Sequence, residues 1–138
     1  MDLTAINQQI SKHNRLINEN ELDIEKHQLG IFVFKYRGHN NTKELKQLTQ
    51  QKRFSELHIK HSKYMIRIFE TYIDLITLDP YQFVRTLKVV LGVMKTNAQD
   101  IEDCMRQLVD IGYYKEQEYK IHMERFMAEI NAWSNNIE

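Results

Sequence analysis

Apolar residues recur in alternating steps of three and four along the segment that begins at Asp79. The segment opens with Asp79-Pro80-Tyr81-Gln82, in which Asp can cap the N-terminus of a helix, Pro suits its first turn and Gln can reach back to the cap. The apolar positions that follow are Val84, Leu87, Leu91, Met94, Ala98, Ile101, Met105 and Leu108. This spacing predicts a long helix that packs lengthwise against other helices, and we expect the rest of the chain to cover it.

A second apolar pattern, with residues seven apart, runs through the first segment of the chain, from Asp2 to about Arg37. One row is wholly aliphatic, and its companion row is polar in the middle. The two rows are Leu3, Ile10, Ile17, Ile24 and Ile31, and Ile6, His13, Asn20, His27 and Phe34. A single aliphatic row is too narrow to hold a helix by itself, so it predicts a helix that depends on a partner. The three polar residues either fix the register of that seam or lie at its solvated edge, and we favour the edge.

The run Ile31-Phe-Val-Phe-Lys-Tyr36, between Gly30 and Gly38, has the composition of a β-strand. The sequence offers no second strand-like run to pair with it, and an isolated strand leaves its backbone groups without hydrogen-bond partners. We therefore predict that residues 30–37 form the aromatic end of the first helix. A short irregular segment is the alternative.

A second helix is predicted at about 42–78, after a loop of Gly, His and Asn residues. Asn41 and Glu44 have the spacing of a capping box at its start. From Tyr64 onward the helix is apolar on most sides, which is typical of a buried helix. We expect it to fold back on the third helix in an antiparallel hairpin at about 42–111.

Gly112 marks either a break or a kink, and beyond it the pattern predicts a fourth helix at about 113–134 or a continuation of the third. Its apolar positions are Tyr119, Met123, Phe126, Ile130 and Trp133. Only 4 Gly and 1 Pro occur in the chain, and turns draw on these residues, so long helices are favoured. We predict one all-α domain at 1–138, an elongated bundle of three to four long antiparallel helices with coiled-coil-like packing.

Composition limits the location and the partners of the protein. Lys plus Arg and Asp plus Glu balance at 19 each, so the net charge favours no class of partner. A single cysteine, Cys104, excludes an internal disulfide and suits a reducing compartment. No signal peptide is recognisable, and the most apolar stretch, Tyr81 to Met94, contains Arg85 and Lys88, which argues against a membrane span. We expect a soluble, cytoplasmic protein.

The local distribution of charge is uneven. Basic residues seven apart form a row along the second predicted helix, which we call the basic row: Lys46, Arg53, Lys60 and Arg67. Residues 100–138 hold nine acidic and four basic residues. We expect the basic row to face these acidic helices within the bundle or in a neighbouring copy. The alternative is that it follows the phosphate backbone of a nucleic acid.

The sequence contains no motif that specifies a reaction. His58 and His61 are one helical turn apart, as are Glu118 and His122, but the repeated Glu-x-x-His motif of di-iron bundles is absent. A His-Glu-x-x-His motif and a cysteine cluster are absent too. Cys104 lies among acidic residues, which raise the pKa of a thiol, so we assign it to packing. We predict no metal, cofactor or small-molecule substrate.

The segment Arg53-Phe-Ser-Glu-Leu-His58 resembles the Arg-x4-His motif of the HEPN ribonucleases, a family of four-helix bundles. The resemblance covers six residues and departs from the family at Phe54, where members usually carry a polar residue. It implies that Arg53 would hold a phosphate and that His58 would act as acid or base.

Taken together, these patterns predict a non-enzymatic protein–protein interaction module: a small adaptor, chaperone or structural subunit of a larger assembly. The incomplete seam of the first helix and the aromatic residues at its end are expected to bind a protein partner or a second copy, because aromatic side chains are enriched among interface anchors. The predicted partner-binding residues are Ile10, Ile17, Ile24, Ile31, Phe32, Phe34 and Tyr36. Nucleic-acid binding through the basic row and a HEPN-like ribonuclease are the alternatives.

Overall fold

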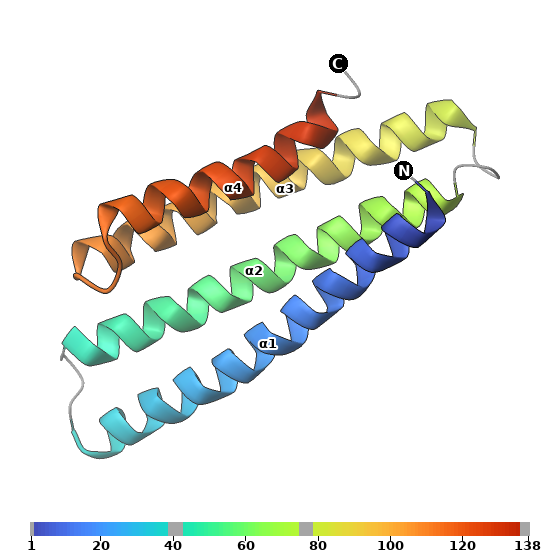
Figure 1. Ribbon diagram of the computed structural model, residues 1–138. Helices are drawn as coiled ribbons and strands as arrows, with labels where there is room; N and C mark the ends of the chain where they lie inside the picture. Colours follow the sequence, from blue (N-terminus) through green and yellow to red (C-terminus); the bar gives the residue numbers. More distant parts are fainter. Residues whose placement is uncertain (1, 39–42, 75–78, 136–138) are drawn as a thin grey trace.

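The computed structural model describes residues 2–38, 43–74 and 79–135, and within these ranges it contains four α-helices and no strand (Figure 1). The helices are α1 (Leu3–Tyr36), α2 (Lys43–Ile73), α3 (Pro80–Asp110) and α4 (Glu116–Ser134). Helices α1 and α2 run antiparallel side by side, and α3 and α4 form a second antiparallel pair (Figure 1). The all-α bundle is therefore confirmed. With 34 residues, α1 is about 51 Å long at 1.5 Å per residue, so the molecule is elongated.

Aspartate side chains cap two of the helices. Oδ1 of Asp2 accepts a hydrogen bond of 2.7 Å from the amide of Ala5, and Oδ1 of Asp79 accepts one of 3.0 Å from the amide of Tyr81. The predicted cap at Asp79 is confirmed, with proline in the first turn of α3. The capping box proposed for Asn41 lies outside the described residues.

The aromatic run after Gly30 is helical, as predicted, and α1 continues to Tyr36. Gly30 itself lies against α2: a Cβ atom at this position would be 3.1 Å from Cδ1 of Leu48. The missing side chain therefore allows α1 and α2 to approach closely at this point. This contact, rather than strand pairing, explains a glycine within an otherwise apolar run.

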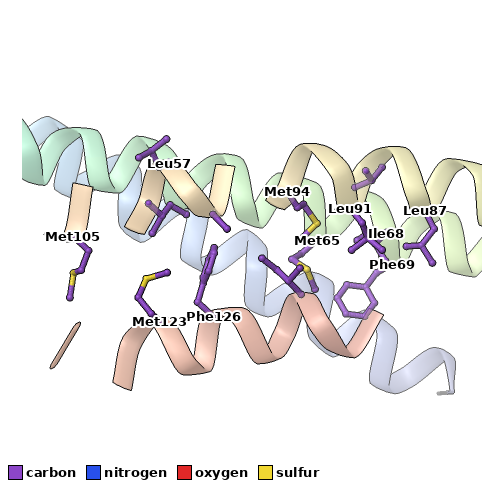
Figure 2. Packing of buried hydrophobic residues seen from close by; sticks show 14 of the residues in the cluster. Leu57, Met65, Ile68, Phe69, Leu87, Leu91, Met94, Met105, Met123 and Phe126 are labelled. Atoms are coloured by element: carbon purple, nitrogen blue, oxygen red, sulfur yellow. The ribbon is translucent and has the colours of Figure 1, made fainter. Parts of the chain in front are cut away.

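The apolar seam of α3 lies at the centre of the core. Seven of its eight predicted positions are buried, and Val84 is half-buried. The seam packs against two groups of residues, one on α2 and one on α4 (Figure 2). They are Leu57, Met65, Ile68 and Phe69 on α2, and Tyr119, Met123, Phe126 and Ile130 on α4. The apolar side of α3 is thus covered by its two neighbours, and the opposite side, which includes Val89 and Val93, is exposed.

Two polar side chains of α3 also bind α2. Nδ2 of Asn97 donates a 3.0 Å hydrogen bond to the carbonyl of Leu57, and Sγ of Cys104 donates to the carbonyl of Gln50 at 3.2 Å. Burial raises the pKa of the Cys104 thiol to about 11, and the nearby Arg53 only partly opposes this. The thiol is a buried packing group, and burial rather than neighbouring acidic residues is the main cause of its raised pKa.

The chain turns between α3 and α4 at Gly112, whose φ of +82° lies in the left-handed region that glycine adopts readily. The amides of Tyr113 and Tyr114 donate hydrogen bonds back to the carbonyl of Leu108. Helix α4 is then held to α3 by the Tyr119 hydroxyl, which donates a 2.6 Å hydrogen bond to Glu102. The chain therefore reverses direction at Gly112, and α4 is a separate helix rather than a continuation of α3.

Replacement of Leu91 by alanine is expected to lower the free energy of unfolding by about 2–5 kcal/mol, because it leaves a cavity in the helix at the centre of the core. Urea denaturation followed by circular dichroism would measure this change. Val89→Ala is the matched control: Val89 lies two residues away and is 69% exposed, so its replacement should cost less than about 0.5 kcal/mol. A loss below about 1 kcal/mol for Leu91→Ala would contradict the central position of α3.

Candidate functional site

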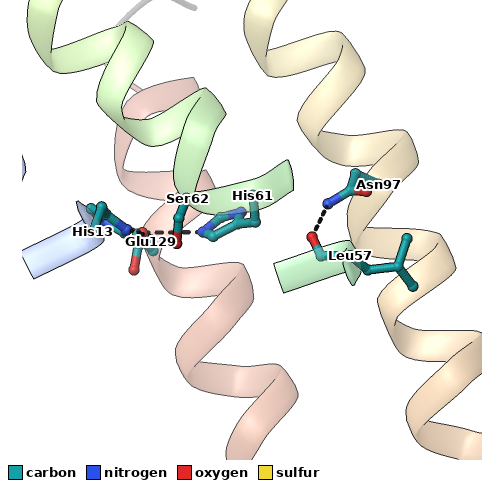
Figure 3. A network of polar contacts seen from close by, with 6 residues as sticks. All are labelled: His13, Leu57, His61, Ser62, Asn97 and Glu129. Carbon is teal, nitrogen blue, oxygen red and sulfur yellow. Dashed lines mark hydrogen bonds and ion pairs between the residues drawn. The ribbon is translucent and has the colours of Figure 1, made fainter. Parts of the chain in front are cut away.

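A cluster of polar side chains, in which His13, His61 and Ser62 are buried and Glu129 is half-buried, joins α1, α2 and α4 (Figure 3). Oε1 of Glu129 on α4 lies 3.2 Å from Nε2 of His61 on α2 and 3.4 Å from Nε2 of His13 on α1. Nδ1 of His13 lies 3.3 Å from Oγ of Ser62, also on α2. His13 is only 2% exposed, so our expectation that it lies at a solvated edge is wrong. The carboxylate that it contacts comes from α4, a neighbour that the periodicity of α1 does not reveal.

The two histidines stabilise the ionised form of the Glu129 carboxyl group. Burial alone would raise the pKa of this carboxyl group, but its contacts with His13 and His61 lower the pKa well below its ordinary range. Glu129 is therefore ionised at neutral pH and links three helices through charge-assisted contacts. Its removal would leave two buried imidazoles without their shared partner, so the cluster has a structural role in positioning α1.

A second histidine cluster lies between α2 and α4. The ring of His58 is 5.1 Å from that of His122, 4.4 Å from Phe54 and 5.7 Å from Phe126, measured between centroids. Burial, with a smaller effect of the neighbouring His122 and His61, lowers the pKa of His58 to about 3. Burial also lowers the pKa of His122. Both rings are therefore neutral at pH 7 and pack as aromatic groups.

This geometry gives no support to an acid–base role for His58. The imidazole packs inward among aromatic rings, whereas Arg53, its partner in the HEPN-like motif, is exposed on α2. A proton donor or acceptor of that kind needs access to the substrate and a pKa near the working pH. In the described part of the chain, no group of three or more His, Cys, Asp or Glu residues is arranged to hold a metal ion.

The aliphatic row predicted to bind a partner faces the bundle. Ile10, Ile17 and Ile24 are half-buried, and Ile31 is buried. Phe34 is half-buried as well. This row covers α2 within the same chain, so most of its apolar area is already removed from water.

The other two predicted residues, Phe32 and Tyr36, belong to a different face of α1. They continue a row with Leu22 and Leu29, at spacings of seven, three and four, which we call the outer face of α1. The four side chains are 57% (Leu22), 65% (Leu29), 62% (Phe32) and 84% (Tyr36) exposed. The rings of Phe32 and Tyr36 stack at 6.3 Å between centroids. The spacing of Leu22 and Leu29 is the signal in the sequence that marks this face, and the longer isoleucine row obscures it.

The basic row is exposed along its whole length. Across residues 43–74 and 79–135, none of its four side chains forms an ion pair with an acidic residue of α3 or α4, so the expected pairing with these helices of the same chain is wrong. One end of the row opens on a groove of about 380 Å³ between α2 and α3, which Arg67 and Arg85 line together. Basic charge thus gathers from two helices at this end of the bundle.

Comparisons with known proteins do not place the chain in a family. No family model matches it, and neither a curated protein nor a solved structure is significantly similar to it. Within the described ranges, none of the helices has the length and apolar character that a membrane span requires. The function must therefore be inferred from the surfaces and clusters described above.

The bundle is expected to lose stability in mild acid because of His58. Its pKa is lower in the folded protein, at about 3, than the ordinary 6.5 of an exposed histidine, so protons bind preferentially to the unfolded chain. Stability from this residue is complete above pH 6.5 and falls as the pH decreases from 6.5 towards 3. Between pH 7 and pH 5 the loss should be about 2 kcal/mol, at about 1.4 kcal/mol for each unit of pKa difference.

Chemical denaturation of the wild type and of His58→Leu at pH 7 and pH 5 would measure this effect. The variant retains His122, whose pKa is also lowered by burial, so part of the acid sensitivity remains, but its loss between the two pH values should be smaller by about 2 kcal/mol. An equal loss in both proteins would show that His58 does not bear the effect.

Proposed function

We propose that this protein acts by binding another protein through the outer face of α1, as an adaptor or chaperone of a larger assembly or as one of its structural subunits. The observation that carries the proposal is the row Leu22, Leu29, Phe32 and Tyr36, in which every large apolar side chain is more than half exposed. The opposite side of the same helix is already packed on α2. Exposed apolar rows of this kind are characteristic of interaction surfaces.

The composition of the outer face supports a protein as the ligand. Two of its four side chains are aromatic, and aromatic side chains bury a large area at a small cost in conformational entropy. Their spacing along one helix suits a partner helix or a groove that receives a helix, because anchors one or two turns apart contact the same partner surface. A small-molecule site would need a concave pocket, whereas this face is the convex side of a helix.

A cytoplasmic location is part of the proposal. Cys104, the only cysteine, is a free thiol buried in the core. A chain with no disulfide to form is suited to a reducing compartment. The partner would then be another protein of that compartment.

Introducing a charge on the outer face should strongly weaken partner binding without unfolding the bundle. Tagged wild type and Leu29→Glu would be used to capture partners from a lysate of the source cells, with quantification by mass spectrometry. Leu29 is 65% exposed, so a partner that uses this face should be reduced at least about tenfold while thermal stability changes little.

Val89→Glu is the matched control in this experiment, since Val89 is an equally exposed aliphatic residue on α3. It should retain the partner. Equal capture by the wild type, Leu29→Glu and Val89→Glu would refute binding through the outer face.

A second candidate function, nucleic-acid binding, is favoured by the exposure of the basic row and by the groove that Arg67 shares with Arg85. Exposed basic side chains aligned along one helix can follow a phosphate backbone and release its counterions. The net charge of zero and the acidic residues of α3 and α4 weigh against it. Protein binding is therefore our first proposal.

If the basic row binds nucleic acid, the affinity for a fluorescently labelled single-stranded oligonucleotide should fall steeply with added salt. The double variant Arg53→Glu, Lys60→Glu should bind at least about tenfold more weakly than the wild type. Lys12→Glu, Arg15→Glu, which reverses two exposed basic residues on α1, is the matched control and should bind almost as the wild type does. An affinity that salt does not change would exclude this function.

A further inference from the structure

We propose that the partner of the outer face of α1 is a second copy of this chain, bound antiparallel about a two-fold axis near Gln28. This inference rests on the proposed function, since it names the partner of the same surface. Two-fold symmetric dimers are the commonest assemblies of identical chains, and their interface must be complementary to itself. The outer face of α1 meets this requirement in both its apolar residues and its charges.

The charges beside the outer face determine how the two copies pair. An axis near Gln28 places each residue of one copy opposite the residue equally far on the other side of Gln28 in the other copy. Glu21 and Lys35 are each seven residues from Gln28 and are both exposed, so Glu21 of each copy faces Lys35 of the other. If Leu22 is taken as heptad position a, then Glu21, Gln28 and Lys35 all occupy position g, which flanks the apolar row. In antiparallel helix pairs, the g positions of one helix lie beside the g positions of the other.

A second pair of charges agrees with the same axis. Glu19 and Arg37 are each nine residues from Gln28 and are exposed; Glu19 lies on α1, and Arg37 is the C-cap residue that follows it. Each copy thus presents Glu19 and Glu21 before Gln28 and Lys35 and Arg37 after it, so antiparallel pairing brings these unlike charges together, whereas the exposed Lys26 lies close to the axis with no acidic residue opposite it. Glu19 forms an exposed ion pair with Arg15 of its own helix at 3.9 Å, a contact weak enough to leave it accessible to a partner.

The apolar residues interlock in this register. Leu22 of one copy comes beside Phe32 and Tyr36 of the other, and the two Leu29 side chains lie on either side of the axis. Glu25, which lies between Leu22 and Leu29 along the row, decides against the parallel arrangement. Parallel pairing would set Glu25 of one copy against Glu25 of the other within the interface, where like charges are strongly unfavourable. Antiparallel pairing keeps Glu25 in the interface, opposite position 31 of the other copy, but holds the two Glu25 side chains apart.

The rest of the bundle leaves room for this dimer. Helix α1 lies along α2 at one side of the bundle (Figure 1), and its inward face also reaches α4 through His13 and Glu129, whereas the side chains of the outer face are exposed. A second copy can therefore lie along the outer face without meeting the other helices. The resulting assembly would have two bundles back to back, joined along the C-terminal half of each α1.

Sedimentation equilibrium of the full chain would test the dimer. The wild type should show a mass that rises from one to two chains with concentration, and Leu29→Glu should remain a monomer while keeping its helical content. Val89→Glu should dimerise as the wild type does. A wild type that stays monomeric up to about 1 mM would overturn the inference, as would a dimer abolished by Val89→Glu but not by Leu29→Glu.

Charge reversal would test the register and the orientation. Glu21→Lys and Lys35→Glu, made singly, each set like charges against one another and should weaken the dimer at least about fivefold. The double variant restores both symmetry-related pairs and should return the dissociation constant to within about twofold of the wild type. A double variant as weak as the product of the two single effects would overturn the antiparallel register.

The outcomes separate this inference from the proposed function. A monomeric wild type that nevertheless captures a different protein, lost in Leu29→Glu, would remove the second copy as the partner and keep the outer face as a binding surface. A monomer whose captured proteins do not respond to Leu29→Glu would remove both.

Discussion

The structure depends on the burial of the apolar seam of α3. Leu91, Met94, Ile101 and Leu108 are almost fully inaccessible to water, and α2 and α4 cover them from two sides. Helix α1 packs mainly on α2, adds Ile6 to the core and reaches α4 through His13. A helix in that position can bury only part of its circumference, so one of its faces must remain in solvent. The position of α1 thus follows from the packing of the other three helices, and so does the exposure of its outer face.

The buried histidines show how α1 is held in that position. Apolar contacts with α2 alone would allow α1 to slide or rotate, because a row of isoleucines seven residues apart fits several registers. Contacts of His13 with Ser62 and Glu129 require one register, since a buried polar group without its partner is costly. We infer that this cluster adds specificity rather than net stability, as buried charged pairs commonly do. It also determines which face of α1 points outward.

Sequence patterns were sufficient for the helices and the central seam but not for the faces of α1. The periodicity of α3 identified its buried positions, because these form one continuous apolar stripe. Asp79 identified the start of the helix, because an N-cap hydrogen bond is a contact within the helix itself. Helix α1 carries two apolar rows, and periodicity does not tell which of them another helix covers. His13 was misplaced for the same reason: its partner Glu129 is more than a hundred residues away in the sequence. The basic row of α2 was wrongly paired with α3 and α4 because net charge per segment does not reveal which faces meet.

Helix α1 has a covered face that holds it to the bundle and an outer face to which we assign the proposed binding. Residues that position the helix, such as His13 and Ile31, are buried, so changes there act through stability. Leu29 and Phe32 contribute little to the core. Their exposed apolar side chains favour aggregation when no partner covers them. A surface with no role would lose such residues readily, because a polar side chain at the same position leaves the fold intact. We therefore propose that a partner covers the apolar outer face, with Glu21 and Lys35, on either side of Gln28, at its edge.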